Sequence, residues 1–408
     1  MKKISIIASD ALPLPLKKDC PTIIIKNNKE YNIYDKCINS TSQGNRTFAF
    51  ANILSKSFEV TVLIPDINYP GKDNIDFEKI PFKITSFNYE AAKLNWSEEL
   101  DRKLLQSDFV IIQTIDGTGF KNCSVLPGNI HVIVDGYNSL LTQIPIQNLY
   151  MHRIQRKVIW EKLIADYTDL LIRSNCVLYA TDNQKRYYEG QFFMIGKLGW
   201  KAFKFSTLLK ISNGIIFHDR VIKEENKDIN LLWYGAIYPW YNPEILLDVL
   251  GGSNINIDFV GIKHPRFNKY HKNFIEKYEK NIDTYHNINV YENYTTNINL
   301  NKYDAAICIS NEWVENNYTI RYRILEMLSY GMPIITNTSI KNEIPFLNKA
   351  VNEFSLFDII PFFSKLKKED MIFPDEEFEL LPTISWDTVL YPLVDYINNF
   401  SKTEEQEK

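Results

Sequence analysis

Short apolar runs alternate with segments of helical periodicity along the first half of the chain. The runs have the length and composition of buried parallel strands, and they occupy residues 4–10, 59–65, 108–114, 131–137 and 177–181. Between them, residues 44–56 and about 148–175 carry apolar positions at helical spacing. Because strand, helix and strand in this order form a βαβ unit, the first half is predicted to be a parallel α/β domain.

A second series of the same kind begins after residue 228. Its predicted strands are residues 229–235, 254–261, 288–292, 304–310 and 333–337. The segment around Gly214, between the two series, is charged and rich in turn-forming residues, as a linker would be. We therefore predict domains at residues 1–210 and 211–384, with an interdomain cleft of the kind that ligands prefer. An apolar-faced helix at residues 385–400 and a frayed tail at 401–408 close the chain.

Residues 11–43, between the first predicted strand and the first predicted helix, form a polar and irregular segment. It contains Pro13, Pro15 and Pro21 and several lysines. A structureless span of this length is usually functional or mobile. We therefore expect this segment to influence which ligand the first domain accepts.

Residues 311–337 combine a strand exit, a charged helix start and a closing Gly-Met-Pro before another strand. The apolar residues of the predicted helix share one stripe, and Arg321 falls among them in the first turn. A cation there opposes the helix dipole and is costly beside apolar packing unless an anion meets it. A phosphate held by Arg321, Arg323 and the helix N-terminus would remove both costs. The alternative is a local ion pair, of Glu315 with Arg321 or of Arg323 with Glu326.

Composition narrows the class of protein. Of the 408 residues, 45% are hydrophobic and 24% charged, which fits a globular protein and neither a disordered chain nor a fibrous repeat. A net charge of −4 argues against a general nucleic-acid binder, because affinity for a polyanion needs clustered lysine and arginine. Five scattered cysteines, never in a C-x-x-C spacing, make a disulfide framework or zinc site unexpected. Without a recognisable leader or an apolar run long enough to span a membrane, the expected compartment is the cytoplasm.

The predicted helix at about residues 148–175 has a basic amphipathic face. Its apolar stripe is flanked by Arg153, Arg156, Lys157 and Lys162. Such a face suits peripheral contact with anionic lipid. The alternative is an ordinary solvated helix face.

Several fragments, in order along the chain, resemble those of one enzyme group. In the first half these are GNRTFAFANIL (44–54) and VDGYNSLL (134–141). In the second half they are LLWYGAIYPWYNPEILLDVL (231–250), FVGIKHP (259–265), ENNYTIRYRILEMLSYGMPII (315–335) and the final SWDTVLYPLVDYI. Together they resemble a GT-B glycosyltransferase of the family 4 type, a group of retaining enzymes that use nucleotide sugars and often build bacterial surface polysaccharides. The resemblance implies a GT-B fold, with two Rossmann-like domains and the last helix crossing back to the first domain.

The chain departs from the common pattern of that family at two places. Of two glutamates normally separated by seven residues, Glu326 matches the second, whereas Tyr318 stands at the first position. The lysine often found after the loop at Gly235 is missing, and Trp240 and Tyr241 stand there instead. The charge of a bound diphosphate would therefore depend more on the arginines.

The resemblance implies roles for particular residues. Donor binding falls to Gly235, Thr319, Arg321, Arg323 and Glu326, with the last as an acceptor for ribose hydroxyls. Asp135 and Glu315 are the candidates for the reaction centre. The candidates for the acceptor side or the cleft are Gly44, Asn45, Arg46, Tyr137, Trp240 and His264. For Asp135 and Tyr137 a strand-end turn is an equally good interpretation, and His264 is more often a loop-capping residue than a base.

The resemblance thus implies a retaining glycosyltransferase that moves a sugar from a nucleotide sugar to a saccharide or lipid-linked acceptor. No Asp-x-Asp motif is found, so a metal-independent reaction without a cofactor is expected, in which the nucleotide sugar is a co-substrate. A nucleotide-sugar 2-epimerase of the same fold and a non-catalytic paralogue that binds a glycan or a partner are the alternatives. Neither the sugar, the nucleotide base nor the acceptor follows from the residues.

Overall fold

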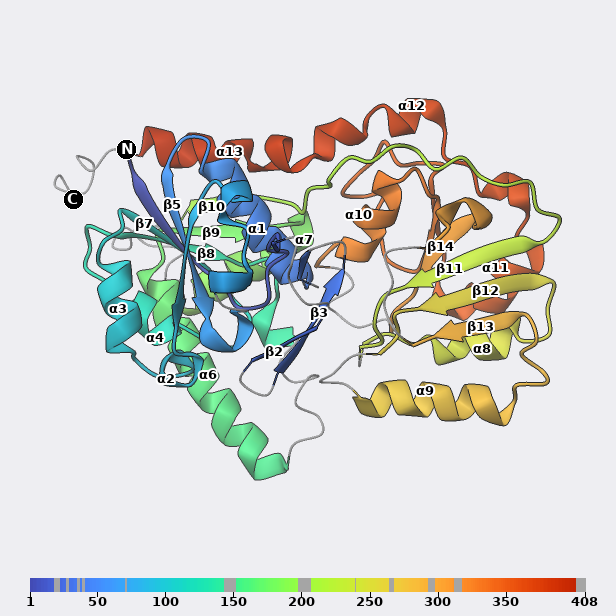
Figure 1. The fold of residues 1–408 in the computed structure, drawn as a ribbon, viewed down its shortest axis with the longest axis horizontal. Coiled ribbons are helices and arrows are strands. Elements are labelled where there is room, and N and C mark those ends of the chain that lie inside the picture. Colours follow the sequence, from blue (N-terminus) through green and yellow to red (C-terminus); the bar gives the residue numbers. More distant parts are fainter. Residues whose placement is uncertain are drawn as a thin grey trace. The chain divides into compact units, whose positions relative to one another are not determined.

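A computed structural model describes residues 1–17, 23–26, 29–34, 37–38, 41–69, 72–142, 152–196, 207–238, 240–263, 268–292, 298–311 and 318–400. The chain divides into two compact units (Figure 1). Unit 1 contains Met1–Ser212 and the chain from Val389 onward, and unit 2 contains Asn213–Thr388. Each unit is built on its own parallel sheet.

Unit 1 has a seven-stranded sheet with the order β10-β9-β8-β7-β1-β5-β6. All its neighbouring strands pair in parallel. The strands are β1 (Lys3–Ile7), β5 (Glu59–Pro65), β6 (Lys83–Phe87), β7 (Phe109–Gln113), β8 (His131–Asp135), β9 (Cys176–Tyr179) and β10 (Thr207–Lys210). The order reverses between β1 and β7, which makes the carboxyl ends of these two strands the switch point of the sheet.

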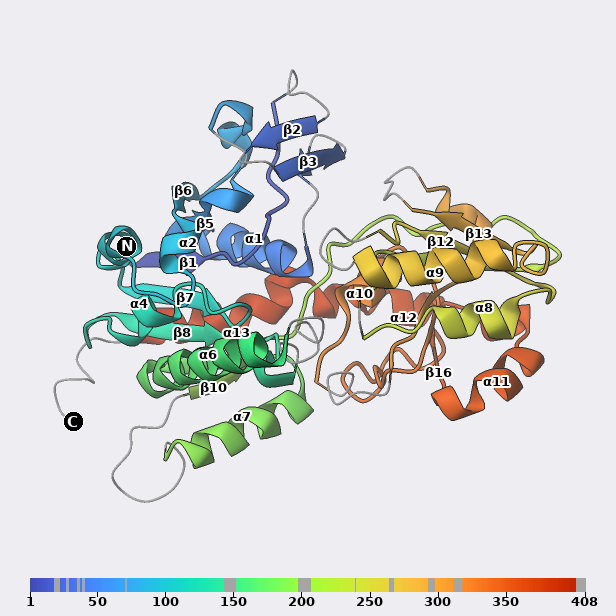
Figure 2. The same ribbon diagram turned by 90° about the horizontal axis from the view of Figure 1, so that it is seen from below.

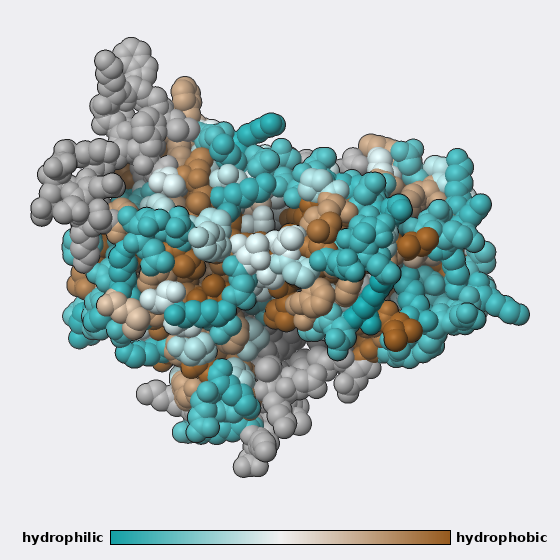
Figure 3. All heavy atoms as spheres, turned by 90° about the horizontal axis from the view of Figure 1, so that it is seen from above, coloured by the Kyte–Doolittle hydropathy of each residue, from teal (hydrophilic) through white to brown (hydrophobic). Residues whose placement is uncertain are grey.

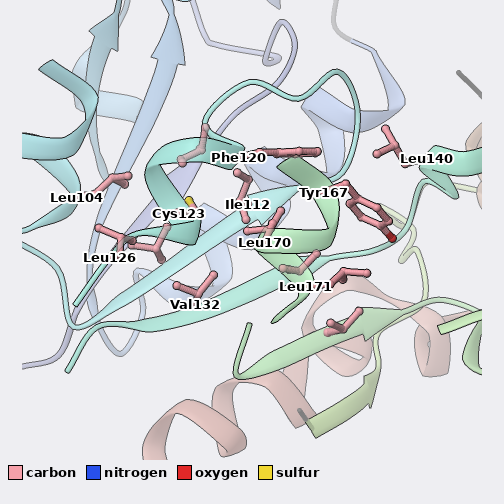
Figure 4. Packing of buried hydrophobic residues seen from close by; sticks show 14 of the residues in the cluster. Leu104, Ile112, Phe120, Cys123, Leu126, Val132, Leu140, Tyr167, Leu170 and Leu171 are labelled. Carbon is pink, nitrogen blue, oxygen red and sulfur yellow. The ribbon is translucent and has the colours of Figure 1, made fainter. Parts of the chain in front are cut away.

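In the described part of unit 1, the helices between the strands are α1 (Ser42–Leu54), α2 (Tyr89–Ala92), α3 (Glu98–Leu104), α4 (Phe120–Ser124), α6 (Arg153–Arg173) and α7 (Asp182–Met194). One core cluster lies where α4 and α6 pack on the sheet, and Ile112, Phe120 and Leu170 converge there (Figure 4). Each of these three side chains is at most 1% exposed. Burial of such apolar surface, worth about 25 cal/mol per Å², is what holds the helices to the sheet.

Unit 2 has a six-stranded parallel sheet with the order β13-β12-β11-β14-β15-β16. Its strands are β11 (Ile229–Tyr234), β12 (Ile255–Val260), β13 (Ile288–Tyr291), β14 (Ala305–Cys308), β15 (Ile334–Thr336) and β16 (Val351–Glu353). Its helices are α8 (Glu244–Leu250), α9 (Asn268–Lys280), α10 (Tyr322–Ser329), α11 (Ile359–Lys365) and α12 (Asp375–Phe378). This order also reverses once, between β11 and β14.

The last helix, α13 (Trp386–Asn399), is divided between the two units. Its first residues cluster with unit 2, and the chain from Val389 onward clusters with unit 1. At its end, the Lys2 ammonium donates to the carbonyls of Ile397, Asn398 and Phe400, which helical hydrogen bonding leaves unsatisfied. The Tyr396 hydroxyl lies 2.9 Å from Nε2 of His131, the first residue of β8. The prediction of a final helix that packs on the first α/β unit is confirmed.

The prediction that residues 11–43 are irregular is wrong in part. Within it the structure has a three-stranded antiparallel sheet of β2 (Ile23–Lys26), β3 (Lys29–Tyr34) and β4 (Cys37–Ile38) (Figure 2). The sequence pattern did not reveal these strands, because the prolines and lysines of the segment have a low preference for strands.

No helix among the described residues is long and apolar enough to cross a bilayer. On the face drawn in Figure 3, most of the surface is hydrophilic and the hydrophobic residues form separate patches. In Figure 1 the first turns of α6 project beyond the other helices of their unit. Those turns expose Ile154 (68%) and Val158 (60%).

Candidate functional site

The strand-order reversal of unit 2 brings three loops together at the carboxyl ends of β11, β14 and β15. The backbone N–H of Asn311 donates to the carbonyl of Trp240 at 2.9 Å. Asn337 accepts from the N–H of Ser310 at 2.9 Å and returns a bond to its carbonyl at 2.7 Å. In open α/β sheets, ligands bind outside the carboxyl ends of the strands at such a reversal. This edge is therefore the candidate site of unit 2.

Gly235, which directly follows β11, lets a guanidinium lie against the backbone. Its φ is +109°, which residues other than glycine rarely adopt. An added Cβ would lie 3.1 Å from Nη2 of Arg323. Nη2 of Arg323 donates to the carbonyl of Ala236 at 2.8 Å. Nη1 of the same side chain is buried and has no hydrogen-bond partner within the described ranges. The guanidinium is thus fixed on one side and has donor capacity on the other.

The ring of Tyr241 holds both arginines of the predicted phosphate site. The guanidinium carbon of Arg323 lies 4.4 Å from the ring centroid, and that of Arg321 lies 5.3 Å from it. Trp233 provides a second ring, 5.5 Å from Arg323. Cations over aromatic faces are attracted by the ring quadrupole without losing their charge. Two adjacent positive groups therefore share one aromatic ring at this edge of the sheet.

Helix α10 begins at these arginines. Arg321 is its N-cap residue, is 8% exposed, and provides no side-chain cap. The first turn of α10 contains no acidic residue. The positive end of the helix dipole therefore adds to the two guanidinium groups, and the combination favours an anion. Thr319, two residues before Arg321, is 6% exposed.

Glu326 lies on α10, one turn beyond Arg323. Burial raises the pKa of its carboxyl to about 7, against the opposing effect of Arg323. Both side chains belong to the described residues, and no ion pair joins them there. The predicted pairing of Arg323 with Glu326 is therefore not formed, and Glu326 retains its full capacity as an acceptor when ionised.

The first-half candidates form a buried ion pair in unit 1. Arg46, on α1, and Asp135, at the end of β8, are 0% and 1% exposed. Nε and Nη2 of Arg46 donate to the two carboxylate oxygens at 2.8 and 2.9 Å, and the guanidinium also donates to the carbonyls of Ile211 and Ser212. The ring of Tyr137 packs 5.0 Å from the guanidinium. Arg46, Asp135 and Tyr137 thus form one fixed cluster.

Gly44 is required by close backbone packing. A Cβ at this position would lie 1.7 Å from the carbonyl oxygen of Ala11, in the loop after β1. The N–H of Gly44 is capped by Thr41 Oγ1 at 3.1 Å, and the N–H of Asn45 donates to the carbonyl of Thr41 at 2.9 Å. The start of α1 is therefore held against the switch point of unit 1.

Two predicted residues, Glu315 and His264, lie outside the described residues. Trp240 is described and is 6% exposed, with its ring stacked on Tyr238 at 4.9 Å. Tyr241 was missed as a member of the site, although its position in place of a lysine was visible. Its contacts to arginines some 80 residues later arise only from the fold, which is why no local pattern reveals them.

Comparisons with known proteins identify the fold. No protein-family model matches the chain, and no curated protein sequence is significantly similar to it. The sucrose-phosphate synthase of Thermosynechococcus elongatus has a similar structure, with a TM-score of 0.64 at 10% identity over 100% of both chains. Anabaena HepE in complex with UDP and glucose gives 0.60 at 11% identity, over 98% of this chain and 100% of that one. An alpha-glucosyltransferase in complex with UDP has a TM-score of 0.52 at 11% identity, over 98% of this chain and 99% of that one. The chain therefore has a GT-B-like α/β fold with two parallel Rossmann-like sheets.

Proposed function

We propose that the chain is a glycosyltransferase whose unit 2 binds the diphosphate of a nucleotide sugar. The observation that carries the proposal is the pair Arg321 and Arg323, held on Tyr241 at the strand-order reversal. A buried guanidinium nitrogen with unused donor capacity is expected where a charged acceptor binds. The start of α10 adds backbone dipoles directed at the same place.

The donor that we propose is a UDP-sugar. Its support is that Anabaena HepE was determined with UDP and with UDP-glucose, and both share the fold of this chain at TM-scores of 0.60 and 0.58. We assign Glu326 to the ribose hydroxyls, because an ionised carboxylate is a pure acceptor. Thr319 and Gly235 would then line the phosphate path.

Transfer requires the enzyme to stabilise the negative charge that grows on the leaving diphosphate. Arg321, Arg323 and the α10 N-terminus would provide this stabilisation, which is strongest when the donors are fixed before the reaction. We propose a reaction that retains the anomeric configuration and needs no divalent metal. Turnover in the presence of EDTA should equal turnover without it, and strict dependence on a divalent ion would contradict this assignment.

The acceptor side is assigned to unit 1, around Gly44, Asn45, Arg46 and Tyr137. We propose a saccharide or lipid-linked acceptor and a role in bacterial surface glycan assembly at the cytoplasmic face of a membrane. Because Arg46 occupies both oxygens of Asp135, this carboxylate would position the start of α1 beside the acceptor. Glu315 remains the candidate at the donor sugar.

Calorimetric titration with UDP tests the donor site. The full chain should bind UDP, and Arg323→Ala or Arg321→Ala should weaken binding by about 10- to 100-fold, as expected for lost charged hydrogen bonds. Lys365→Gln, an exposed change on α11, is the matched control and should leave the affinity unchanged. Equal affinity for UDP in wild type and both arginine variants would refute the assignment.

One observation favours a second candidate, a paralogue that binds glycans without catalysis. Asp135 is fully engaged by Arg46, and Tyr318 replaces the first glutamate of the expected pair. Slow hydrolysis of a panel of UDP-sugars separates the two functions. An enzyme should release free sugar and UDP, whereas a binding module should bind UDP and release none.

A further inference from the structure

Three neighbouring strands of unit 1 have one apolar face and one polar face. The apolar face is buried and carries Ile4, Ile6, Val60, Val62 and Ile64, each at most 3% exposed. By the strand register, the opposite face carries three rows: Lys3 with Glu59, then Ser5 with Thr61 and Lys83, then Ile7 with Leu63 and Thr85. Parallel sheets of this class are normally covered on both faces and apolar on both. On this face Ser5, Ile7 and Leu63 are buried, whereas Glu59, Thr61 and Thr85 are partly exposed and Lys3 and Lys83 are exposed. The polar positions at the amino-terminal ends of the strands therefore mark a part of the sheet that is only partly covered.

A groove of about 650 Å³ lies over this polar face. Its floor includes the hydroxyls of Ser5, Thr61 and Thr85, and one wall is formed by the end of α3 with Lys103. Phe77, whose ring is 41% exposed, also lines the groove. This volume is within the range of small-molecule sites in proteins, about 300–1,000 Å³.

Hydroxyl groups of the groove have unused hydrogen-bonding capacity. Ser5 and Ser107 bond to each other at 2.6 Å. Thr61 lies on β5 and Thr85 on the edge strand β6. Both are partly buried, and their hydroxyls have no protein partner among the residues that the structure describes. Each hydroxyl can donate one bond and accept others. The centre of the groove thus presents donors and acceptors to whatever occupies it.

The charges that line the groove are mainly positive. Lys83 pairs with Glu59 at 2.7 Å, and Lys103 pairs with Glu99 on its own helix. The Lys3 ammonium forms no ion pair with a described residue, although it lies close enough to Glu59 to lower the pKa of that carboxyl after the larger effect of Lys83. Because Lys83 and Lys103 are each paired with a glutamate, the excess positive charge at the groove is that of Lys3, which suits an anion.

We propose that this groove is a second ligand site of the chain, which binds an anionic saccharide. Sugar hydroxyls would bond to Thr61 and Thr85, the apolar face of a sugar ring would pack on Phe77, and a carboxylate or phosphate would meet Lys3. A lipid tail does not fit, because the floor is polar and desolvating its hydroxyls without partners is costly. A lone phosphate uses only the lysines and leaves the hydroxyls and the ring without a role.

The groove is separate from the residues proposed for the donor and the acceptor. Lys3, Glu59 and Lys83 are the first residues of their strands, whereas Arg46, Asp135 and Gln113 lie at the carboxyl edge of the same sheet. Occupancy of the groove therefore does not depend on the proposed donor site. Binding in the groove would give the chain a second contact with a charged glycan.

Calorimetric titration of the full chain with a hyaluronan tetrasaccharide tests the proposal, and maltotetraose and inorganic phosphate serve as comparison probes. The charged tetrasaccharide should bind saturably and more tightly than maltotetraose. Thr61→Val with Thr85→Val, which keeps shape and removes both hydroxyls, should weaken binding about fivefold or more. Lys3→Gln should weaken it and reduce its dependence on salt.

Lys365→Gln, on unit 2, is the matched control and should change nothing. UDP affinity should be the same in all groove variants, which separates this site from the donor site and confirms that the variants are folded. No saturable binding of the tetrasaccharide, equal binding by the Thr61→Val/Thr85→Val variant, or binding of phosphate as tight as that of the tetrasaccharide would each overturn the proposal.

Discussion

At the scale of single residues, Tyr241 is the contact on which the proposed donor site depends. Its ring touches both arginines and the residue is 8% exposed, so this neutral side chain fixes the spacing of two like charges. A carboxylate in the same place would pair with the arginines and compete with a phosphate. The aromatic residue that replaces the expected lysine therefore suits a site that must stay positive.

Replacing Tyr241 tests this interpretation. Tyr241→Leu should weaken UDP binding by about 5- to 30-fold, since two cation–π contacts of about 0.5–1 kcal/mol each are lost. Tyr241→Phe keeps the ring and should retain nearly full affinity. Calorimetry on both variants checks the prediction, and an equal loss in Tyr241→Phe would show that the hydroxyl, and not the ring, is what matters.

Glu326 gives the donor site a predicted dependence on pH. Burial raises the pKa of this carboxyl to about 7, so it is largely protonated at pH 6 and ionised at pH 8. If ribose hydroxyls donate to the carboxylate, UDP affinity should rise about three- to tenfold between these pH values. Glu326→Gln cannot ionise and should bind with a much smaller change, which also corrects for titration of the nucleotide itself. Parallel curves for the two proteins would exclude this role.

Residues whose role depends on local sequence were predictable, and those that depend on distant packing were not. Arg321 stood out because helical periodicity placed a cation among apolar residues, and the structure finds it buried beside Tyr241. The bidentate pair of Arg46 with Asp135 joins residues 89 positions apart, so no periodicity reveals it. The hydrogen bond from Arg323 to the carbonyl of Ala236 was unpredictable for the same reason, since the two residues are far apart in the sequence.

At the scale of elements, interior strands were easier to predict than edge strands. β1, β7 and β8 are buried on both faces in most positions and appear as apolar runs. β6 and β10 lie at the edges of the unit 1 sheet, with polar and partly exposed residues, and their patterns were missed. The polar alternation of β6 is the feature that now marks the groove over Thr61 and Thr85.

Helix α13 makes the stability of unit 1 dependent on pH. Burial, with smaller effects from Arg173 and Lys2, lowers the pKa of His131 from 6.5 to about 4, and its Nε2 faces the hydroxyl of Tyr396 on α13. Between these two pKa values the unfolded chain binds a proton that the folded chain does not. Stability should therefore be fully present above about pH 6.5 and fall as the pH decreases toward 4, by up to about 3 kcal/mol.

Urea denaturation at several pH values measures this effect. His131→Gln removes the titrating group and keeps an amide within reach of Tyr396, so its stability should vary less between pH 4 and 6.5. Tyr396→Phe should cost about 1 kcal/mol for the lost hydrogen bond near pH 7. An unchanged pH profile in His131→Gln would show that other groups control the acid limit.

Helix α6 carries the prediction of peripheral membrane contact. Its first turns expose Ile154 and Val158 between several basic residues, which suits an interface of anionic lipid. Cosedimentation with phosphatidylglycerol vesicles should therefore exceed that with phosphatidylcholine vesicles, and Ile154→Ser with Val158→Ser should reduce it severalfold. Ile172→Ser, an exposed change at the other end of α6, is the control and should have no effect. Equal binding by all three proteins would favour a solvated helix face.

At the scale of the whole molecule, two parallel sheets each offer one switch point, and the proposed ligands differ between them. In unit 2 the guanidinium of Arg323, beside the reversal between β11 and β14, has unused donor capacity toward the described residues. In unit 1 the reversal between β1 and β7 lies beside an arginine whose charge is already balanced by Asp135. A nucleotide diphosphate should therefore bind to unit 2 in preference to unit 1, although both units are built on a parallel sheet.

Hydrogen exchange with and without UDP tests this choice along the full chain. Ligand that binds only the native state slows local opening, so protection should increase at residues 234–237, 309–311 and 322–325, the carboxyl ends of β11 and β14 and the start of α10. Amides of β1, β7 and β8 should exchange at unchanged rates. Arg323→Ala should abolish the protection at the same UDP concentration, whereas Lys365→Gln should preserve it. Protection centred on α1 and the end of β8 would instead place the nucleotide in unit 1, where Arg46 would have to exchange Asp135 for phosphate, and the assignment of the two units would be reversed.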